Sequence, residues 1–427
     1  MPLNIEFEQY KLDNGLRVVL HQDKRVPLVA INVWYHVGSK NELPGKTGYA
    51  HLFEHMMFQG SEHIEADMHF KLIQSVGGTL NGSTFFDRTN YFETLPSHYL
   101  EMGLWLEADR MGFLLPALTQ EKLDTQLDVV KNERRQRVDN QPYGLWLEKM
   151  LELAYPPNFP YHWPVIGYME DLDTATMDDV QQFFKTWYAP NNASLVVCGD
   201  FEKNEAKEMI AGYFGSIPAN PAIPESFYEA DFSFEGERRL ELYDRVQLPR
   251  IYMAYHIPAY GSKESYEADL LSDILSSGKS ARLYKELVYK QQIAQEAQAF
   301  YLPLQETSLF IIMATAKPGV AIEDLEQALQ NELERLCADG VYNREVRRVK
   351  NQVEARKLRE LQTMAMRADY LNQFAVYFDQ PQLINTEIER YEKITCADMG
   401  NLCAKYLQHN NRVVLHFLPR EQKGGRA

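Results

Sequence analysis

The sequence predicts an α+β protein made of two homologous α/β-sandwich domains, each a mostly antiparallel sheet with helices on one face. An internal repeat runs through the chain, and each half passes from strand-like segments through helical segments to a final strand-like segment. At roughly 100–200 residues per domain, 427 residues suit two domains, and a hydrophobic content of 45% can supply a core for each.

The repeat rests on segments that align in order along the chain. The aligned pairs are residues 50–60 with 268–278, 176–179 with 395–398, and 188–197 with 407–416. The last pair places Asn191-Asn192 in register with Asn410-Asn411. An ordered series of matches indicates two copies of one domain of ordinary size.

Each half opens with strand-like runs and closes with a β-branched run, with amphipathic helical stretches between them. The turn residues 13–15 bound the first run. The predicted strands include residues 16–20, 29–35, 195–197 and 413–415, and the predicted helices include residues 177–188 and 323–336.

A proline-rich segment separates the two halves. Pro218, Pro221 and Pro224 fall close together, and proline continues neither a helix nor a central strand. The predicted organisation is a first domain at residues 1–214, a linker at residues 215–234 and a second domain at residues 235–427.

Composition and charge exclude several classes of function. The net charge of −16 would repel a phosphate backbone, so no nucleic-acid partner is expected. No apolar run is long enough for a membrane span. The 4 cysteines are scattered, which is typical of packed thiols in a reducing setting. The first residues show no secretory signal, so we expect a cytoplasmic protein, or a periplasmic one if a signal has been removed.

The segment from His51 to His55, with Glu54 inside it, carries the strongest chemical signal. On a helix of about 3.6 residues per turn, positions four apart share a face, so both imidazoles project together with the glutamate beside them. Two imidazoles can hold Zn²⁺ while other coordination positions stay open, and a carboxylate off the metal can take a proton from water. This spacing is the inverted zincin motif, and it is rare by chance with only 11 histidines in the chain.

A catalytic zinc site needs a third protein ligand, commonly a carboxylate. Residues 127–137 have a helical pattern in which Glu133 is the carboxylate nearest the middle. Spacing alone does not distinguish Glu133 from the other acids, and a surface ion pair with Arg137 at i+4 is the alternative.

The motif at residues 51–55 and the Val-Val-x-x-Glu segment at residues 129–133 occur in one chain. Together they resemble the M16 family, the inverzincin peptidases that include insulin-degrading enzyme, pitrilysin and mitochondrial processing peptidase. The similarity covers the whole chain, whose length suits the short, two-domain branch that includes mitochondrial processing peptidase and the bacterial M16B peptidases. Supporting matches lie at residues 12–18, 77–84 and 187–192, and at Asp87, Thr89 and Tyr91.

The resemblance implies a zinc metallopeptidase with one Zn²⁺ per chain. The metal ligands of the family correspond to His51, His55 and Glu133. Glu54 corresponds to the general base that activates the attacking water and then protonates the leaving amine.

The resemblance also implies a peptide-binding edge strand formed by Asn81, Gly82, Ser83 and Thr84. Main-chain hydrogen bonds then supply affinity, which makes such an enzyme tolerant of substrate sequence. One departure lies near the ligands: the family usually carries a second glutamate seven residues before the third ligand, and this chain has the neutral Gln126 there.

The second half lacks the groups that complete family members bring to the substrate. The aligned positions of the zinc motif hold Asp269, Ser272 and Asp273, while Val288 and Gln295 replace an expected arginine and tyrosine. Each oxyanion donor contributes about 10²–10³ in rate. We therefore predict a heterodimer whose other subunit, a homologue without the zinc motif, supplies the arginine and tyrosine. A self-sufficient homodimer that uses other donors is the alternative.

The leading interpretation is a zinc-dependent metalloendopeptidase that hydrolyses peptide bonds of oligopeptides or small unfolded proteins. The resemblance implies that the peptide is held as a strand in a chamber of four homologous domains. A non-catalytic scaffold subunit is the alternative, but a scaffold has no need of the motif and Glu133 together. A processing peptidase for basic presequences is compatible with the net charge of −16 and ranks below general peptide degradation.

Overall fold

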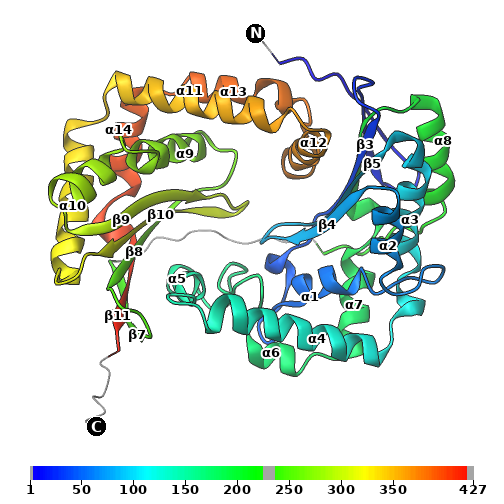
Figure 1. The fold of residues 1–427 in the computed structure, drawn as a ribbon, viewed down its shortest axis with the longest axis horizontal. Helices are drawn as coiled ribbons and strands as arrows, with labels where there is room; N and C mark the ends of the chain where they lie inside the picture. Colours follow the sequence, from blue (N-terminus) through cyan, green and yellow to red (C-terminus); the bar gives the residue numbers. More distant parts are fainter. Residues whose placement is uncertain (1–2, 225–235, 421–427) are drawn as a thin grey trace. The chain divides into compact units, whose positions relative to one another are not determined.

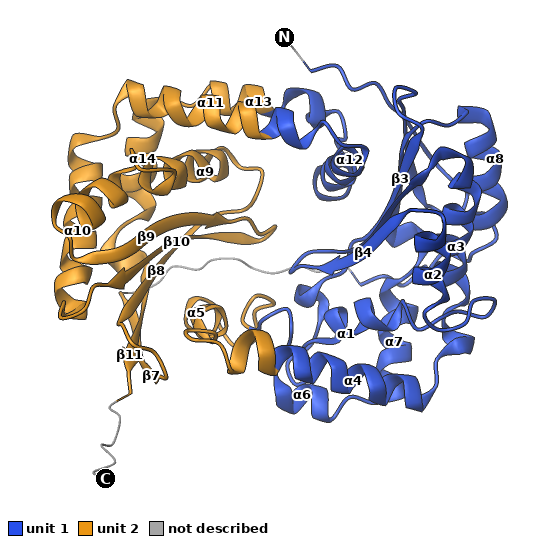
Figure 2. Ribbon diagram, viewed as in Figure 1, with its two compact units in different colours: residues 1–134, 163–227, 357–387 blue, residues 135–162, 228–356, 388–427 orange. Residues whose placement is uncertain are grey.

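The structure is a computed structural model that describes residues 3–224 and 236–420 (Figure 1). Residues 225–234 of the predicted linker lie outside the described part of the chain. The described residues form two compact units, each assembled from separate stretches of sequence (Figure 2). Unit 1 draws on residues 1–134, 163–227 and 357–387, and unit 2 draws on residues 135–162, 228–356 and 388–427.

Unit 1 contains a six-stranded sheet in the order β1-β2-β6-β3-β5-β4. All neighbouring strands are antiparallel except β2 and β6, which are parallel. Strand β4 ends the sheet, so its outer edge pairs with no strand among the described residues. The strands are β1 (Glu8–Lys11), β2 (Arg17–Gln22), β3 (Leu28–Tyr35), β4 (Thr79–Thr84), β5 (Thr89–Pro96) and β6 (Ala193–Gly199).

Helices cover one face of this sheet and form the main core of unit 1. Alternate residues of the strands, such as Val18, Ile31 and Val197, pack against apolar helix residues such as Phe53 and Leu104. The helices of this unit are α1 (Tyr49–Met56), α2 (Met68–Ser75), α3 (Leu100–Phe113), α4 (Gln120–Arg134), α6 (Met169–Asp173), α7 (Met177–Trp187) and α8 (Lys203–Phe214).

The opposite face of the same sheet is covered by α12 (Met364–Phe378), a helix from the second half of the sequence (Figure 2). Val19, Ala30 and Val196 point to this face and pack against Leu371 and Phe374. Because the central strands β2, β3 and β6 are buried on both faces, the sheet needs a helical layer on each side.

Asp369 fixes α12 to this face through polar contacts. Its Oδ1 atom accepts hydrogen bonds from Asn32 Nδ2 at 3.1 Å, Trp34 Nε1 at 3.1 Å and Asn90 Nδ2 at 3.3 Å. These bonds satisfy buried polar groups on β3 and β5. Asn372 adds a bond from its Nδ2 atom to the Asn32 carbonyl at 2.8 Å. The position of α12 is therefore fixed by directional bonds as well as by packing.

Unit 2 contains a five-stranded sheet in the order β7-β11-β8-β10-β9, with β7 and β11 parallel and the other pairs antiparallel. The predicted α+β class with two mostly antiparallel sheets is confirmed. The strands are β7 (Arg238–Asp244), β8 (Arg250–Pro258), β9 (Ala294–Leu302), β10 (Thr307–Ala316) and β11 (Arg412–Pro419). The remaining helices are α5 (Trp146–Ala154), α9 (Lys263–Ser276), α10 (Ile322–Asp339), α11 (Asn343–Glu360), α13 (Leu383–Glu392) and α14 (Cys396–Tyr406). No helix in the described residues combines the length and apolar character needed to cross a bilayer.

The two sheets repeat one topology, because β2-β6-β3-β5-β4 and β7-β11-β8-β10-β9 follow the same order. Local details repeat as well. Thr176 and Thr395 begin α7 and α14 with the same capping box. Asn192 Nδ2 donates to the Trp187 carbonyl, and its counterpart Asn411 donates to the Tyr406 carbonyl, each at 2.8 Å. The structure thus contains the repeat that the sequence predicted.

The compact units differ from two contiguous domains because each half contributes a helix to the other unit. In unit 2, α5 from the first half packs on β8 and β11, with Trp146 stacked on Tyr252 at 4.8 Å between ring centroids. In unit 1, α12 from the second half takes the equivalent place. A sequence repeat reveals which segments are related but not which sheet each helix covers. The predicted boundaries at residues 214 and 235 therefore describe where the two sequence repeats end and begin, and as domain boundaries they stay a prediction.

The helix exchange predicts that the halves do not fold separately. A fragment of residues 1–224 lacks α12 and exposes Val19, Ala30 and Val196. We expect this fragment alone to aggregate, and co-expression with the remaining part of the chain to restore a soluble complex. Solubility and thermal unfolding of the purified species measure the effect. A cooperatively unfolding monomer of the fragment alone would contradict the prediction.

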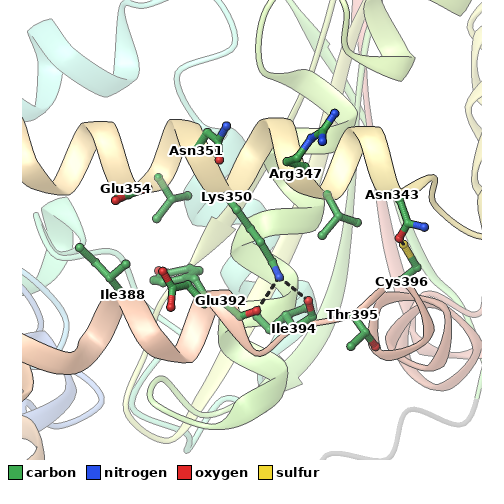
Figure 3. Close-up of a pocket in the computed structure, with 13 residues that line it drawn as sticks. Asn343, Arg347, Lys350, Asn351, Glu354, Ile388, Glu392, Ile394, Thr395 and Cys396 are labelled. Atoms are coloured by element: carbon green, nitrogen blue, oxygen red, sulfur yellow. Dashed lines mark hydrogen bonds between the residues drawn. The ribbon is translucent and has the colours of Figure 1, made fainter. Parts of the chain in front are cut away.

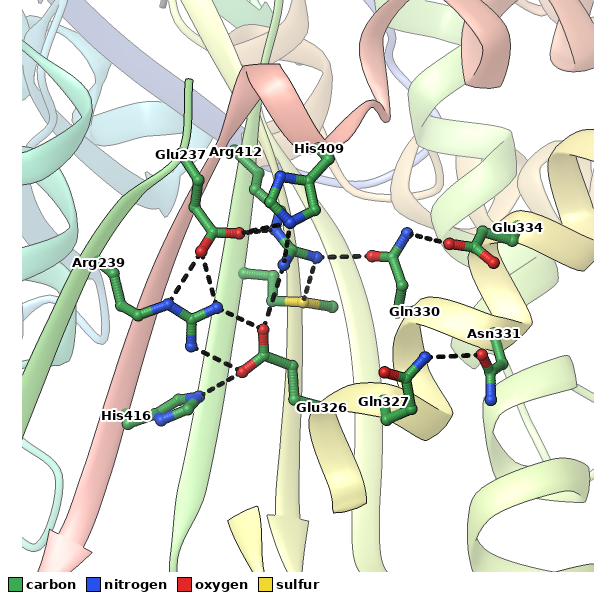
Figure 4. A network of polar contacts seen from close by, with 11 residues as sticks. Glu237, Arg239, Glu326, Gln327, Gln330, Asn331, Glu334, His409, Arg412 and His416 are labelled. Atoms are coloured by element: carbon green, nitrogen blue, oxygen red, sulfur yellow. Dashed lines mark hydrogen bonds and ion pairs between the residues drawn. The ribbon is translucent and has the colours of Figure 1, made fainter. Parts of the chain in front are cut away.

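A charged network joins α10 to β7 and β11 in unit 2 (Figure 4). Glu326 accepts two hydrogen bonds from Arg239, at 2.8 and 2.6 Å, and its Oε2 atom lies 2.8 Å from His416 Nε2. The buried side chain of Arg412 also donates a hydrogen bond from its Nη2 atom to Glu326 Oε1 at 3.2 Å. Burial opposes ionisation of Glu326, but the bonds from Arg239 and His416 outweigh it and hold its pKa well below the usual range.

The lowered pKa of Glu326 predicts a pH-dependent contribution to stability. Ionised Glu326 stabilises the fold above the unfolded-chain pKa of about 4.3, and this contribution is lost as pH falls below it. We expect Glu326→Gln to lower the free energy of unfolding by about 2 kcal/mol at pH 7. The difference from the wild type should shrink between about pH 5 and pH 3. Urea unfolding across this range, with Glu323→Gln on an exposed position of the same helix as the control, measures it. An equal effect of Glu326→Gln at every pH would refute the assignment.

Candidate metal centre

Helix α1, which carries the His51–His55 motif, begins at a buried carboxylate. Glu42 Oε2 accepts a hydrogen bond from the Gly48 backbone N–H at 2.9 Å, and Oε1 accepts one from Ala50 at 2.8 Å. These donors have no partner within the helix, so the carboxylate caps its N-terminus. Burial raises the pKa of Glu42 well above its usual range, while the two backbone bonds oppose the rise.

The start of α1 also needs glycine at position 48. Gly48 has φ +85°, and a Cβ atom there would lie 2.7 Å from the Ile166 carbonyl oxygen. The neighbouring loop is tied to α4 by Arg134, whose Nη1 atom donates to the Gly167 carbonyl at 2.5 Å. One loop therefore contacts the beginning of α1 and the end of α4.

This arrangement brings the predicted ligands His51, His55 and Glu133 together. Glu133 Oε2, in the last turn of α4, lies 3.8 Å from His51 Nε2 and 3.4 Å from His55 Nε2. The two imidazole centroids are 4.9 Å apart. One ligand atom from each residue lies within 4.8 Å of the others, and all three side chains are partly exposed. Two imidazoles and one carboxylate form a donor set that suits Zn²⁺ and leaves a coordination position open.

Glu54 lies on the same helix and turns toward β4. Its Oε2 atom accepts a hydrogen bond from Thr84 Oγ1 at 2.6 Å. Burial raises the pKa of Glu54, and the bond from Thr84 and the charge of His55 partly offset the rise. A carboxyl group with a raised pKa, close to the ligands but outside the ligand group, suits a general base.

The four residues predicted to bind substrate lie on β4. Asn81, Gly82, Ser83 and Thr84 form its last four positions, at the edge of the sheet of unit 1. Their role in substrate binding stays a prediction. Gln126 is buried on α4, two helical turns before Glu133, the predicted third ligand.

The structure also places the residues that replace the expected arginine and tyrosine in unit 2. Val288 packs against the core of unit 2, and Gln295 is exposed on β9. Arg282, which precedes Val288 in the same segment of the chain, forms an ion pair with Glu345 at 2.7 Å. Its guanidinium is therefore already engaged within unit 2.

Helices α9 and α11 of unit 2 contain a charge-inverted counterpart of the ligand group. Asp269 and Asp273 stand at the aligned positions of the two histidines. Arg356 on α11 lies 3.6 Å from a carboxylate oxygen of Asp269 and 3.5 Å from one of Asp273. An arginine thus supplies the positive charge between these two helices.

A second cluster of potential ligands in unit 1 is better explained as part of the core. His69, Glu93 and Glu107 are buried and also bring ligand atoms within 4.8 Å of one another. However, the buried Arg110 donates to Glu107 at 2.9 Å and lies over the Tyr91 ring at 4.3 Å. Burial and the charge of Glu107 raise the pKa of Glu93 well above its usual range. The buried Arg110 guanidinium already supplies a positive charge to this cluster, so the cluster does not suit a metal cation.

Unit 2 contains a hollow of about 430 Å³ beside α11, lined by residues from α11, α13 and α14 (Figure 3). Its polar side chains hold helix ends. Lys350 Nζ donates to the carbonyls of Glu392 at 2.7 Å and Ile394 at 2.6 Å, and Cys396 contacts Asn343 Oδ1 at 3.2 Å. The hollow contains none of the predicted site residues.

Comparison with known proteins gives a consistent result. Residues 17–159 match the profile described as Insulinase (Peptidase family M16), and residues 174–353 match the Peptidase M16 inactive domain. The zinc protease PqqE of Helicobacter pylori is 33% identical over 418 residues, which cover 96% of this chain and 93% of that protein. The chain belongs to peptidase family M16.

Solved structures show the same M16 fold. The crystal structure of a protease from Helicobacter pylori has a TM-score of 0.91 and 29% sequence identity, and the match covers 97% of this chain and 99% of that one. A structure titled peptidase M16 inactive domain from Pseudomonas fluorescens has a TM-score of 0.85 at 16% identity, covering 97% and 98% of the two chains. At that identity the second match shows the fold alone.

Two contacts of this M16 chain lie outside what its sequence predicts. The family resemblance places Thr84 only on the substrate strand, whereas its hydroxyl donates to Glu54. No sequence pattern singles out Glu42, although it caps α1. The spacing of Glu42 from the Gly-Tyr-Ala sequence at residues 48–50 is not a helix-cap signature, because the capping carboxylate lies outside the usual N-cap position.

The cap of α1 predicts a cost for Glu42→Gln. Each carboxylate oxygen accepts one backbone N–H, so an amide NH₂ in place of one oxygen would face a donor. We expect the free energy of unfolding to fall by about 1–3 kcal/mol. Chemical unfolding measures the change, with Glu62→Gln at an exposed position as the control. Wild-type stability in Glu42→Gln would show that the cap contributes nothing.

Proposed function

We propose that this M16 chain is a zinc-dependent metalloendopeptidase that hydrolyses peptide bonds of oligopeptides or small unfolded proteins. The observation that carries the proposal is the convergence of His51, His55 and Glu133, with ligand atoms within 4.8 Å of one another. The name of the Helicobacter pylori relative, a zinc protease, supports the same metal and reaction class.

The proposed site holds one Zn²⁺ per chain through His51, His55 and Glu133. When bound there, the metal supplies a Lewis acid that polarises the peptide carbonyl and acidifies water. Glu54 is not a ligand in this arrangement. Its carboxylate takes a proton from the attacking water and delivers it to the nitrogen of the leaving amine.

We propose that strand β4 binds the substrate backbone. The outer edge of β4 pairs with no strand among the described residues, so its backbone groups can receive an extended peptide. Asn81, Gly82, Ser83 and Thr84 are the positions that this pairing involves. Affinity from main-chain bonds favours a broad range of unfolded peptides over one sequence.

For full activity we propose a second subunit. Val288 and Gln295 cannot supply the charge and hydroxyl of an arginine and a tyrosine, and Arg282 is paired with Glu345. A homologue that lacks the zinc motif, in a heterodimer, is the source we favour. A homodimer that uses other donors is the alternative, and a non-catalytic scaffold ranks below both because it does not need the ligand group.

Hydrolysis of a quenched fluorescent peptide tests the reaction. We expect the wild type to bind one Zn²⁺ per chain and to hydrolyse the peptide when the candidate partner is present. Glu54→Gln should keep the metal but lose about 10²–10⁴ in rate, because Glu54 is a base and not a ligand. His55→Gln should lose the metal, while Asp273→Asn, at the aligned position of unit 2, should keep it.

Three results would each contradict part of the proposal. Full activity of the chain alone would replace the heterodimer with the homodimer. Undiminished activity in Glu54→Gln would remove its role as base. Absence of both hydrolysis and bound metal, with and without the partner, would leave the scaffold as the explanation.

A further inference from the structure

Thr84 makes the one hydrogen bond that the Glu54 carboxylate receives within the described residues. The Oγ1–Oε2 distance of 2.6 Å is typical of a hydroxyl donating to an ionised acceptor. Thr84 is the last residue of β4 and pairs with Thr89 on β5. The donor therefore belongs to the strand that lies along the substrate path, and the acceptor belongs to the helix that carries the ligands.

Gly82 provides the space for this contact. Residues two apart on a strand share a face, so Gly82 and Thr84 both face α1. A Cβ atom on Gly82 would lie 3.0 Å from Glu54 Cγ and 3.3 Å from Oε1. The side chain of Glu54 thus passes directly over Gly82 before its carboxylate reaches Thr84.

The contact distinguishes the two oxygens of the carboxylate. Oε2 accepts the Thr84 hydroxyl, whereas no hydrogen bond to Oε1 is found among the described residues, so Oε1 is the less engaged oxygen for a proton from water. Without this bond the carboxylate could rotate about its terminal torsion, which is broad and roughly two-fold. A base held in one orientation loses less conformational freedom when the reaction begins.

We propose that Thr84 is a positioning residue that orients Glu54 for proton transfer, and that its side chain does not bind substrate. The inference rests on the proposed function for the role of Glu54. It replaces the substrate-binding role that the family resemblance implies for the Thr84 side chain. It also links the two tasks of β4: the strand that receives the peptide backbone is the strand that aligns the base.

Thr84→Val removes the hydroxyl with little change in shape, and Thr84→Ser restores it. In the assembly that is active for the wild type, we expect Thr84→Val to lower kcat about 10–100-fold, with KM within about twofold. Thr84→Ser should recover most of kcat. Thr386→Val, at an exposed position of α13 and outside the proposed peptide-binding strand, is the control and should leave both constants unchanged. Zinc content and thermal unfolding should be the same in all variants.

A raised KM with unchanged kcat in Thr84→Val would overturn the inference, because it would make Thr84 a substrate contact. An equal loss in Thr84→Ser would also overturn it, because the hydroxyl would not be the active group.

Crystal structures of the wild type and of Thr84→Val test, independently of activity, whether the Thr84 hydroxyl orients the Glu54 carboxylate. We expect one Glu54 orientation in the wild type and a rotated or divided carboxylate in the variant. An unchanged carboxylate would refute positioning. A wild-type protein that hydrolyses no peptide but shows one Glu54 orientation in its crystal structure would contradict the proposed function. The Thr84–Glu54 contact itself would still be supported.

Discussion

The fold depends on covering both faces of two apolar sheets with helices. In unit 1 this requires α12 from the second half of the chain, and in unit 2 it requires α5 from the first half. Asp369 of α12 contacts Asn32 on β3 and Asn90 on β5. These strands belong to the sheet whose edge strand is β4. The candidate site is built on a sheet whose burial involves the whole chain.

Within unit 1 the chemistry depends on where α1 begins. Glu42 and Gly48 fix the first turn, which places His51 and His55 against the last turn of α4. From the same helix, Glu54 reaches to Thr84 on the edge strand. The proposed ligands, base and peptide-binding edge thus meet at one short helix and its immediate contacts. Small residues matter here because the helix and strand approach closely.

The sequence was informative wherever chemistry follows local spacing. The helical spacing of His51, Glu54 and His55 predicted a shared face, and the Asn-Asn pairs predicted the repeat. Glu133 could be singled out only through the family resemblance, since many acids lie on its helix. The helix exchange, the cap by Glu42 and the bond from Thr84 depend on contacts between segments distant in sequence. Periodicity and spacing carry no information about such contacts.

The charge inversion in unit 2 has a consequence for how the two halves depend on a metal ion. A helix pair whose facing groups are two imidazoles and a carboxylate can be joined by a metal ion, whereas Asp269, Asp273 and Arg356 are joined by a cation that the chain itself encodes. The contact in the second copy therefore needs no metal ion. Under the proposed function, metal deprivation acts on only one of two related frameworks in the same molecule.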